Sequence, residues 1–530
     1  MSKNQNSASQ KPRISRHLKI VLTVLAVVVI GLAVAAEYAL HHVEPIMRDR
    51  VVESLTNRFK SQVELGEFHV TFTQGVGVEG KNLSLHSSLY PDLPPQIVIN
   101  QFSFHTGLFD LFRTPMHIGL VTLKGLTINL PPKTQRAAMP KAGKGSGKIK
   151  IFIDRIICDD AVLLMMTDNP RKVPLEFDIH ALTLKRVGAH QPMHFKAQLV
   201  NPKPIGDIAT EGNFGPWNAD APHNTHVDGK YSFTKADLST THGITGMLSS
   251  TGSYSGPLDT ITVDGKTDTP DFSVDVSGHK VALHTDFHAI VDGTNGNTYL
   301  QPVRAHFLNT DVTAHGEVVR GPAGKGHDIT LDVVINKGRI EDLLEIGAKT
   351  DPPVMTGTVR LKTKFNLPTG RDSVSRRLRL RGTFSVEDAS FTNTKIQEKV
   401  DELSLRGQGK ADEAKQLPQE TDTIAQPLPE IPVTLQGTFS MANQNVALPD
   451  LEFKVPGADI TLAGKYSLDG EQFDFAGHAR FQSRVSGIVG GWKGMLLTPI
   501  DPFFAKHGAG TEVPIKITGT KSNPHFALNF

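Results

Sequence analysis

The sequence predicts a mostly β protein, in which an N-terminal transmembrane helix precedes an elongated, twisted antiparallel β-sheet groove with a few short helices. Three observations lead to this fold class. An uncharged apolar run lies near the start of the chain, apolar and polar residues then alternate over most of its length, and paired turn residues separate the alternating runs. A chain of 530 residues is also too long for one compact core.

The apolar run at residues 20–36 is expected to cross a membrane, because with the interfacial residues after it the run approaches the roughly 17–25 residues that a bilayer needs. Basic residues precede the run and acidic residues follow it. The positive-inside rule therefore places residues 1–17 in the cytoplasm, a single-pass anchor at 18–40, and the rest of the chain across the membrane. A cleaved signal peptide is the alternative, since residues 33–36 offer a small-residue cleavage site.

Two helices are expected outside the membrane. Apolar residues from 43 to 59 recur at spacings of three and four, and Pro45 suits a first helical turn. This amphipathic helix could lie in the lipid interface, but capping the end of the sheet is the commoner role. A second helix is expected over 394–403.

From residue 63 the apolar period becomes two, which is typical of half-buried strands. The turn pairs Asn295-Gly296, Asp469-Gly470 and Asp228-Gly229 favour antiparallel hairpins between such strands. The alternating residues proposed to line the groove are Phe68, Val70, Phe72, Leu126, Ile128, Leu130, Leu378, Leu380 and Phe384.

A weak repeat of Gly-x-aromatic also runs through the chain. Its spacing is irregular, which excludes a solenoid or propeller of fixed period. A glycine followed by an inward aromatic residue is ordinary in sheets, and an evolved repeat is the alternative. The repeat occurs at Gly212/Phe214, Gly229/Tyr231, Gly252/Tyr254, Gly382/Phe384, Gly437/Phe439 and Gly464/Tyr466.

Two segments rich in Pro, Gly or charge are expected to be loops, at 131–148 and 409–430. They divide the exported part into an N-terminal β region at 41–130, a central sheet at 149–408 and a C-terminal β region at 431–530. A Gly-broken hydrophobic stretch in the last region contains Trp492 and Leu496, a candidate distal contact that would either close the sheet or touch a membrane or partner.

Composition and motifs argue against catalysis. The formal charge of +2 lacks the basic excess that nucleic-acid binding needs, and the single Cys158 excludes a disulfide within the chain. Motifs for phosphate loops, nucleophile elbows and helical zinc sites are missing, so we expect no enzyme, metal or cofactor. The closest histidine pairs, which have no evident third ligand, are His190/His194, His223/His226 and His284/His288.

Three segments carry a family resemblance: "LGEFHVTFTQGVGVEGKNLSL" at 65–85, "GLVTLKGLTINLP" at 119–131 and "GTEVPIKITGTKSNPHFALNF" at 510–530. With the two N-terminal helices in front of them, they resemble the AsmA-like family, related to TamB and YhdP. Members are periplasmic proteins of diderm bacteria that are anchored in the inner membrane. The match covers about residues 18–131 and 431–530.

The resemblance implies a protein that supports outer-membrane assembly by holding or conducting phospholipid along an apolar β-groove. Its partners would be membrane lipids, the inner membrane and envelope proteins. Exposing an acyl chain to water costs about 0.8 kcal/mol per CH₂, so such transfer needs an apolar lining. The alternative is a non-enzymatic interaction module with closed β-sandwich cores, because alternation cannot distinguish a core from a groove.

Overall fold

The computed structural model describes residues from 44 to 528 with gaps, of which the longest are 131–150, 415–430 and 489–510; before residue 44 it describes only 28, 30 and 31. The described part is mostly β, as predicted. The chain forms two compact units, unit 1 at residues 1–191 and unit 2 at 192–530. This division lies at neither of the two expected loop segments.

Unit 1 is built on one twisted sheet. The first two strands both pair with the third, and each later strand pairs with the one before it. The strands are β1 (Ser61–Leu65), β2 (Phe68–Thr71), β3 (Val76–Ser87), β4 (Ile97–Thr106), β5 (Met116–Leu130), β6 (Ile151–Met165) and β7 (Leu175–Val187).

One pair in unit 1 corrects the expectation of a wholly antiparallel sheet. Strands β5 and β6 run parallel, with Ile118 opposite Ile153 and Thr127 opposite Val162. Parallel neighbours need a crossover of a dozen or more residues, and the segment at 131–150 provides that length. The sequence offered no sign of the direction in which β6 would run, because alternation is the same in both directions.

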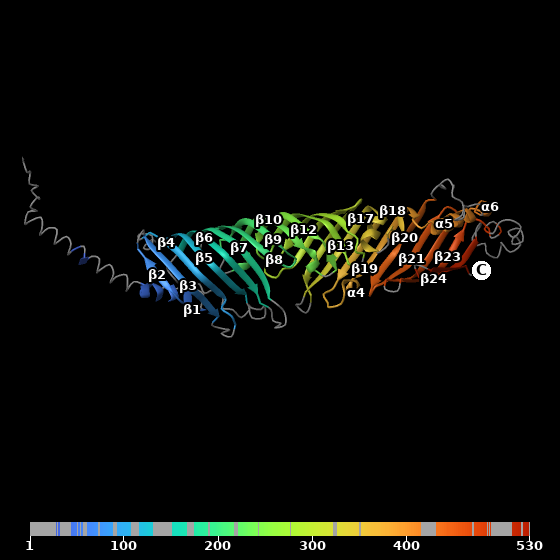
Figure 1. Ribbon diagram of the computed structural model, residues 1–530. Helices are drawn as coiled ribbons and strands as arrows, with labels where there is room; N and C mark the ends of the chain where they lie inside the picture. The colour runs from blue at the N-terminus through green and yellow to red at the C-terminus, as the bar shows by residue number, and fades with distance from the viewer. Residues whose placement is uncertain are drawn as a thin grey trace, which may run out of the picture. The chain divides into compact units, whose positions relative to one another are not determined.

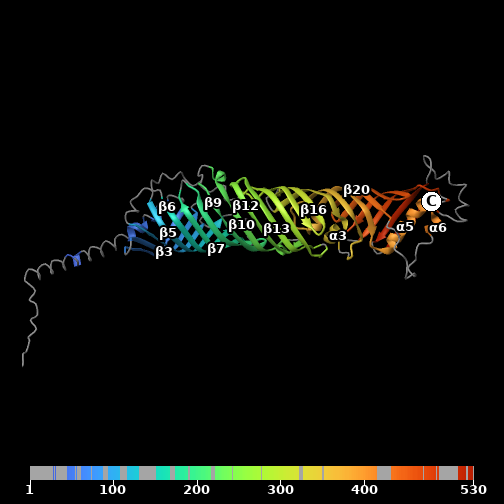
Figure 2. The same ribbon diagram turned by 90° about the horizontal axis from the view of Figure 1, so that it is seen from above.

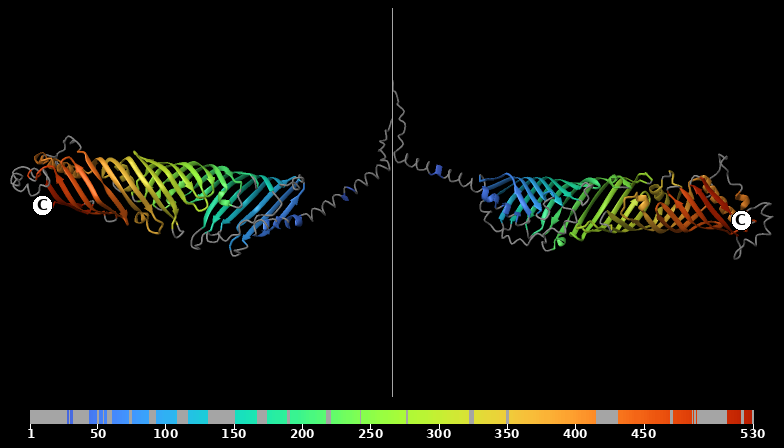
Figure 3. Two further views of the ribbon diagram at one scale, coloured as in Figure 1. Left: turned by 180° about the vertical axis from the view of Figure 1, so that it is seen from behind. Right: turned by 90° about the horizontal axis from the view of Figure 1, so that it is seen from below.

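The predicted amphipathic helix caps the edge of unit 1. Described residues at 44–49 and 51–53 are helical and lie beside the first strands (Figure 3). Glu44 accepts a hydrogen bond from the Val70 amide at 2.9 Å, and Arg48 donates to the Leu65 carbonyl at 2.5 Å. The helix thus satisfies backbone groups that an edge strand would leave open. Its apolar side chains Met47, Val51, Val52 and Leu55 pack on the buried cluster of β1 to β4.

Unit 2 is an antiparallel meander in which strands lie side by side in chain order (Figure 1). Among the described strands of unit 2, the short β11 alone departs from this order, by pairing with β13. The strands are β8 (Met193–Pro202), β9 (Ile205–Phe214), β10 (His226–Asp237), β11 (Ile244–Thr245), β12 (Met247–Pro257), β13 (Ile261–Val274), β14 (Val281–Val291), β15 (Thr298–Phe307), β16 (Thr310–Arg320), β17 (His327–Arg339), β18 (Met355–Leu367), β19 (Arg379–Phe391), β20 (Val433–Ala442), β21 (Asn445–Val455), β22 (Ala458–Ser467), β23 (Gln472–Phe481), β24 (Thr511–Thr520) and β25 (Asn523–Leu528).

Short helices sit at the strand ends of unit 2, and Figure 2 labels α3 (Ile340–Gly347), α5 (Thr394–Gly407) and α6 (Ala411–Ala414). The helix predicted over 394–403 is confirmed as α5. The Asn393 side chain caps this helix by accepting a hydrogen bond from the Ile396 amide at 3.2 Å. The expected loop at 409–430 contains α6, and its part from 415 on lies outside the described residues. The helices are η2 (Pro222–Asn224), η3 (Leu238–Thr240), α3 (Ile340–Gly347), α4 (Val374–Arg377), α5 (Thr394–Gly407) and α6 (Ala411–Ala414).

Of the three predicted turns, one is confirmed and one is wrong. Asn295-Gly296 connects β14 to the antiparallel β15. Asp228-Gly229 lies inside β10, where the glycine leaves room for a neighbouring ring: a Cβ there would come within 2.6 Å of the Tyr254 hydroxyl. Asp469-Gly470 lies outside the described residues, between two strands that do pair antiparallel.

The main buried cluster of unit 2 lies under α5. Val386, Val433 and Phe481 are at most 3% exposed, and Val400 of α5 packs with them. Ile340 and Leu343 of α3 pack against the same cluster. Hydrogen bonds also attach α3 to the sheet. The carboxylate of Asp342, which is 3% exposed, accepts one hydrogen bond from the Thr310 hydroxyl at 2.7 Å and another from the Asn309 amide at 2.9 Å.

We expect Asp342→Ala to lower the free energy of unfolding of unit 2 by about 1–3 kcal/mol, because two donors in a buried site lose their acceptor. The matched control is Asp286→Ala, which removes an exposed carboxylate paired with Lys266 and should cost less than about 1 kcal/mol. Urea titration measures the free energy of unfolding of both variants, and hydrogen exchange of the β15 and β16 amides reports the local stability near Asp342. Equal losses in the two variants would contradict the structural role of Asp342.

Candidate functional site

The candidate site is one face of the unit 2 sheet, which we call the apolar face. Strand register places Tyr231 opposite Gly252, Gly252 opposite Gly265, and Gly265 opposite Phe287. The same row continues across later strands, through residues that all point to this side of the pleat. Its further members are Val303, Ala314, Val333, Thr363, Gly382 and Phe439.

Charge is almost absent from the apolar face. From β8 to β24, the strand positions that share this face by register hold no Asp, Glu or Lys, and a single Arg. That residue, Arg320, ends β16, and its guanidinium donates to the Asn295 carbonyl at 2.6 Å. The face is therefore uncharged across the middle of every strand, although charged residues make up 21% of the sequence.

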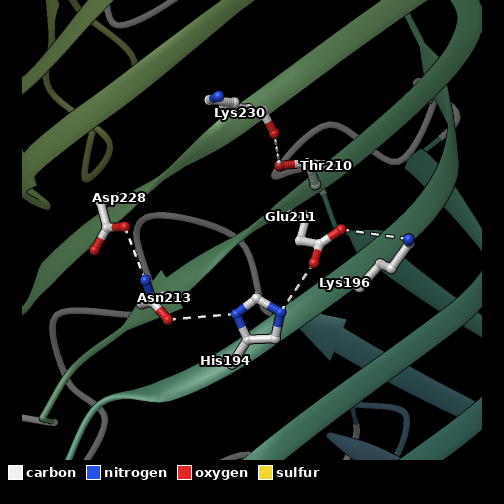
Figure 4. A network of polar contacts seen from close by, with 7 residues as sticks. All are labelled: His194, Lys196, Thr210, Glu211, Asn213, Asp228 and Lys230. Carbon is white, nitrogen blue, oxygen red and sulfur yellow. Dashed lines mark hydrogen bonds and ion pairs between the residues drawn. The ribbon is translucent and has the colours of Figure 1, made fainter.

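The opposite face, which we call the polar face, carries the charges as cross-strand pairs. Figure 4 shows one example, in which His194 lies between Asn213 and Glu211, with ring nitrogen to oxygen distances of 3.3 and 3.1 Å. Lys196 lies 3.3 Å from the same Glu211 carboxylate. The hydrogen bonds from Lys196 and then His194 lower the pKa of Glu211.

Aromatic side chains lie over glycines on the apolar face of the middle strands. A Cβ at Gly265 would come within 2.6 Å of both the Phe287 ring and the Tyr231 hydroxyl, and one at Gly229 would meet Tyr254. Glycine thus leaves room for rings from neighbouring strands. The Gly-x-aromatic repeat was the sequence signal for this packing, but it did not show which glycine each ring would cover.

The apolar face is the sheltered side of the unit 2 sheet. Both α3 and α5 pack on it, and most of its large side chains are buried or half-buried. The sheet also curls until opposite strand ends touch. Gly243, in the turn before β11, lies against Val374 of α4 at the other end of the strands, so that a Cβ at Gly243 would be 2.9 Å from a Val374 methyl carbon.

A hollow of about 720 Å³ lies on the polar face rather than the apolar face. It is a trench between two rows of side chains that cross β12 to β16, one containing His284 and His306 and the other Lys266 and Arg304. Its histidines are held by carboxylates: His284 lies 2.6 Å from Asp268. Because its walls are exposed ion pairs, the trench offers no apolar enclosure.

The predicted lining residues of unit 2 fall on the apolar face. Leu380 and Phe384 are half-buried in β19, opposite Phe365 and Leu361. The Phe384 ring stacks edge-on against Phe439, with centroids 6.2 Å apart. Leu378 lies before β19, at the C-cap of α4.

Three of the six predicted lining residues of unit 1 are buried, two are half-buried and one is exposed. Phe68 and Val70 are 7% and 5% exposed beneath the N-terminal helix, and Leu126 is 9% exposed in a second cluster that Ile128 packs against. Leu130 is half-buried at the end of β5. Phe72, just after β2, is 39% exposed. The sequence could not show this enclosure, because alternation identifies the inward face of β2 and not what covers it.

Cys158 lies in the unit 1 core at 1% exposure, among Leu126 and Ala161. Burial, with the neighbouring carboxylates of Asp159 and Asp160, raises the pKa of its thiol to about 11. Within the described part of the chain, no group of three or more His, Cys, Asp or Glu side chains could hold a metal ion. His190 lies outside that part.

Several predictions fall on residues that the structure does not describe. Trp492 and Leu496 are among them, as are most of residues 18–40. The helices of the described regions include none with the length and apolar character required to cross a membrane. The membrane anchor and the distal contact therefore stay predictions.

Comparison with known proteins returned nothing: no family model, no curated protein and no solved structure matches the chain.

Gly265→Ala should lower the free energy of unfolding by about 1–3 kcal/mol, because the new methyl group would displace the Tyr231 and Phe287 rings. Gly119→Ala in β5 is the control, since a Cβ there would have no atom within 4 Å, and we expect a change below about 0.5 kcal/mol. Thermal unfolding and near-UV circular dichroism report stability and ring packing. An unchanged near-UV spectrum in Gly265→Ala would refute the ring-on-glycine arrangement.

Native Cys158 should resist thiol reagents. With a pKa of about 11, its thiolate at pH 8 is about 0.1% of the population, roughly a hundredfold less than for an ordinary cysteine. Labelling with iodoacetamide should be very slow in the folded protein, increase about tenfold per pH unit while the fold persists, and become complete in urea. Fast stoichiometric labelling at pH 8 without urea would show that the thiol is accessible.

Proposed function

We propose that this protein is a membrane-anchored, periplasmic AsmA-like protein that supports outer-membrane assembly by holding or conducting phospholipid acyl chains on the apolar face of unit 2. The observation that carries the proposal is the absence of charge from that face across β8 to β24, apart from Arg320 at a strand end. A path for acyl chains must avoid charges, because a lipid tail cannot solvate them.

The half-buried state of the face supports the same proposal. Phe365, Leu380 and Phe439 are neither enclosed by a second sheet nor fully open to water in the described structure. A chain of CH₂ groups laid against them would leave water at about 0.8 kcal/mol per group. The resemblance of the terminal segments to the AsmA-like family suggests phospholipid as the ligand and the cell envelope as the place.

The alternative is a non-enzymatic interaction module of the envelope with closed cores. The burial of Phe68 and Val70 under the N-terminal helix favours it for unit 1, and the cluster under α5 favours it for one end of unit 2. The two functions differ in the middle of unit 2, where the described apolar side chains form no fully buried cluster. At one end of β17 to β19 the buried cluster includes Ile335, Val359 and Val386. The lipid proposal therefore concerns β8 to β16 and the other end of β17 to β20, where Phe365, Leu380 and Phe439 lie half-buried.

Photo-crosslinking in cells tests the proposal on the full chain. p-Benzoylphenylalanine replaces Leu380 on the apolar face, and the matched control carries it at the next residue, Arg381, on the polar face. After irradiation in a diderm host, we expect phospholipid adducts on the β19 peptide at Leu380 and at least several-fold fewer at Arg381, as measured by mass spectrometry.

A second variant, Phe365→Asp, places a charge opposite Leu380 and should abolish the lipid adduct while circular dichroism stays unchanged. Thr383→Asp on the polar face should leave the adduct intact. If both crosslinking positions yield only protein adducts, the lipid function fails and the closed interaction module takes its place.

A further inference from the structure

The apolar face carries one band of hydroxyl groups that neither its charge pattern nor its aromatic packing explains. Ser250 of β12 lies directly opposite Thr267 of β13, and Thr267 directly opposite Thr285 of β14. Tyr231 reaches this row from β10, with its hydroxyl 3.1 Å from Ser250 Oγ. We call these four residues the hydroxyl row. Adjacent strands lie about 4.8 Å apart, so the row spans roughly 10 Å of an otherwise apolar surface.

The hydrogen bonds within the hydroxyl row do not use all of its hydroxyl protons. Thr267 and Thr285 share one bond between their Oγ1 atoms at 2.5 Å, and Tyr231 and Ser250 share another. Each pair has two hydroxyl protons and uses one of them internally. Among the described residues, these four side chains make no other hydrogen bond, so each pair retains one proton for an outside acceptor.

The neighbouring pair has no such surplus. Tyr254 lies 2.7 Å from Thr210 Oγ1, and Thr210 donates to the Lys230 carbonyl at 3.0 Å. Both protons of that pair are therefore used within the protein. Tyr231, Thr267 and Thr285 are in addition half-buried rather than enclosed, so a ligand on the apolar face can reach them.

We propose that the hydroxyl row binds the ester carbonyl oxygens of an acyl lipid, an inference that rests on the proposed lipid function. The row offers neutral donors and no charge, which suits a neutral acceptor and not a phosphate or an ammonium group. Apolar side chains flank it on the same face, with Phe233 at one end and Ala305 at the other. The ester region of the lipid lies on the row, and its acyl chains extend over the apolar residues on either side.

A purely structural role for these residues makes a different prediction. Threonine pairs across strands stabilise sheets, and removal of their hydroxyls would then change stability without changing ligand preference. The decisive quantity is therefore the selectivity between two lipids, measured on protein of confirmed fold.

The test compares ester-linked and ether-linked phosphatidylcholine with identical chains, which differ in the carbonyl oxygens. Purified full-length protein is equilibrated with vesicles of each lipid, and bound lipid is quantified by mass spectrometry. We expect the wild-type protein to prefer the ester lipid by roughly three- to tenfold, as one or two neutral hydrogen bonds provide. The triple variant Tyr231→Phe, Thr267→Val, Thr285→Val should lose the preference and bind the ether lipid as before.

The control variant Thr363→Val, Tyr466→Phe removes hydroxyls from the same face outside the row and should retain the preference. If the triple variant misfolds, Tyr231→Phe alone should reduce the preference. Equal wild-type binding of the two lipids, or a preference that survives in the triple variant, would overturn the role of the row while leaving the lipid function standing. If neither lipid binds, both proposals fail.

Discussion

The structure of unit 2 depends on one constraint: a sheet with an uncharged face must keep that face from water without a second sheet to cover it. Because side chains alternate between the two faces of a strand, the charged residues lie on the polar face. There they form ion pairs such as that between Lys266 and Asp286. Curling of the sheet then shelters the other side, as the contact between Gly243 and Val374 shows. The helices α3 and α5 complete this shelter at the strand ends.

Glycine makes the curl compatible with large aromatic residues. The Phe287 ring and the Tyr231 hydroxyl occupy the space that a side chain at Gly265 would need. Gly229, inside β10, leaves room for Tyr254 in the same way. At these positions glycine is needed because it has no side chain, and not because its backbone can adopt unusual conformations.

The sequence identified what depends on local pattern. The alternation with a period of two predicts the strands, and the helix predicted over 394–403 lies within α5. It could not identify what depends on contacts between distant segments. The parallel pairing of β5 with β6, the cover over Phe68, and the alignment of Ser250 with Thr285 follow from register and packing, which one strand's pattern does not contain.

The distribution of polar atoms on the apolar face separates packing from recognition. Two hydroxyls in closed parts of the face are satisfied within the protein: Thr310 donates to Asp342 and Thr511 to the Ser483 carbonyl. Where the face is half-open, each pair of the hydroxyl row has one hydroxyl proton that is not donated to another atom of the described residues. In a dry core such protons would cost free energy. On the open part of the sheet, these protons can be donated to an acceptor that exchanges. The acceptor is water when the protein is free of lipid and a lipid oxygen when lipid is bound.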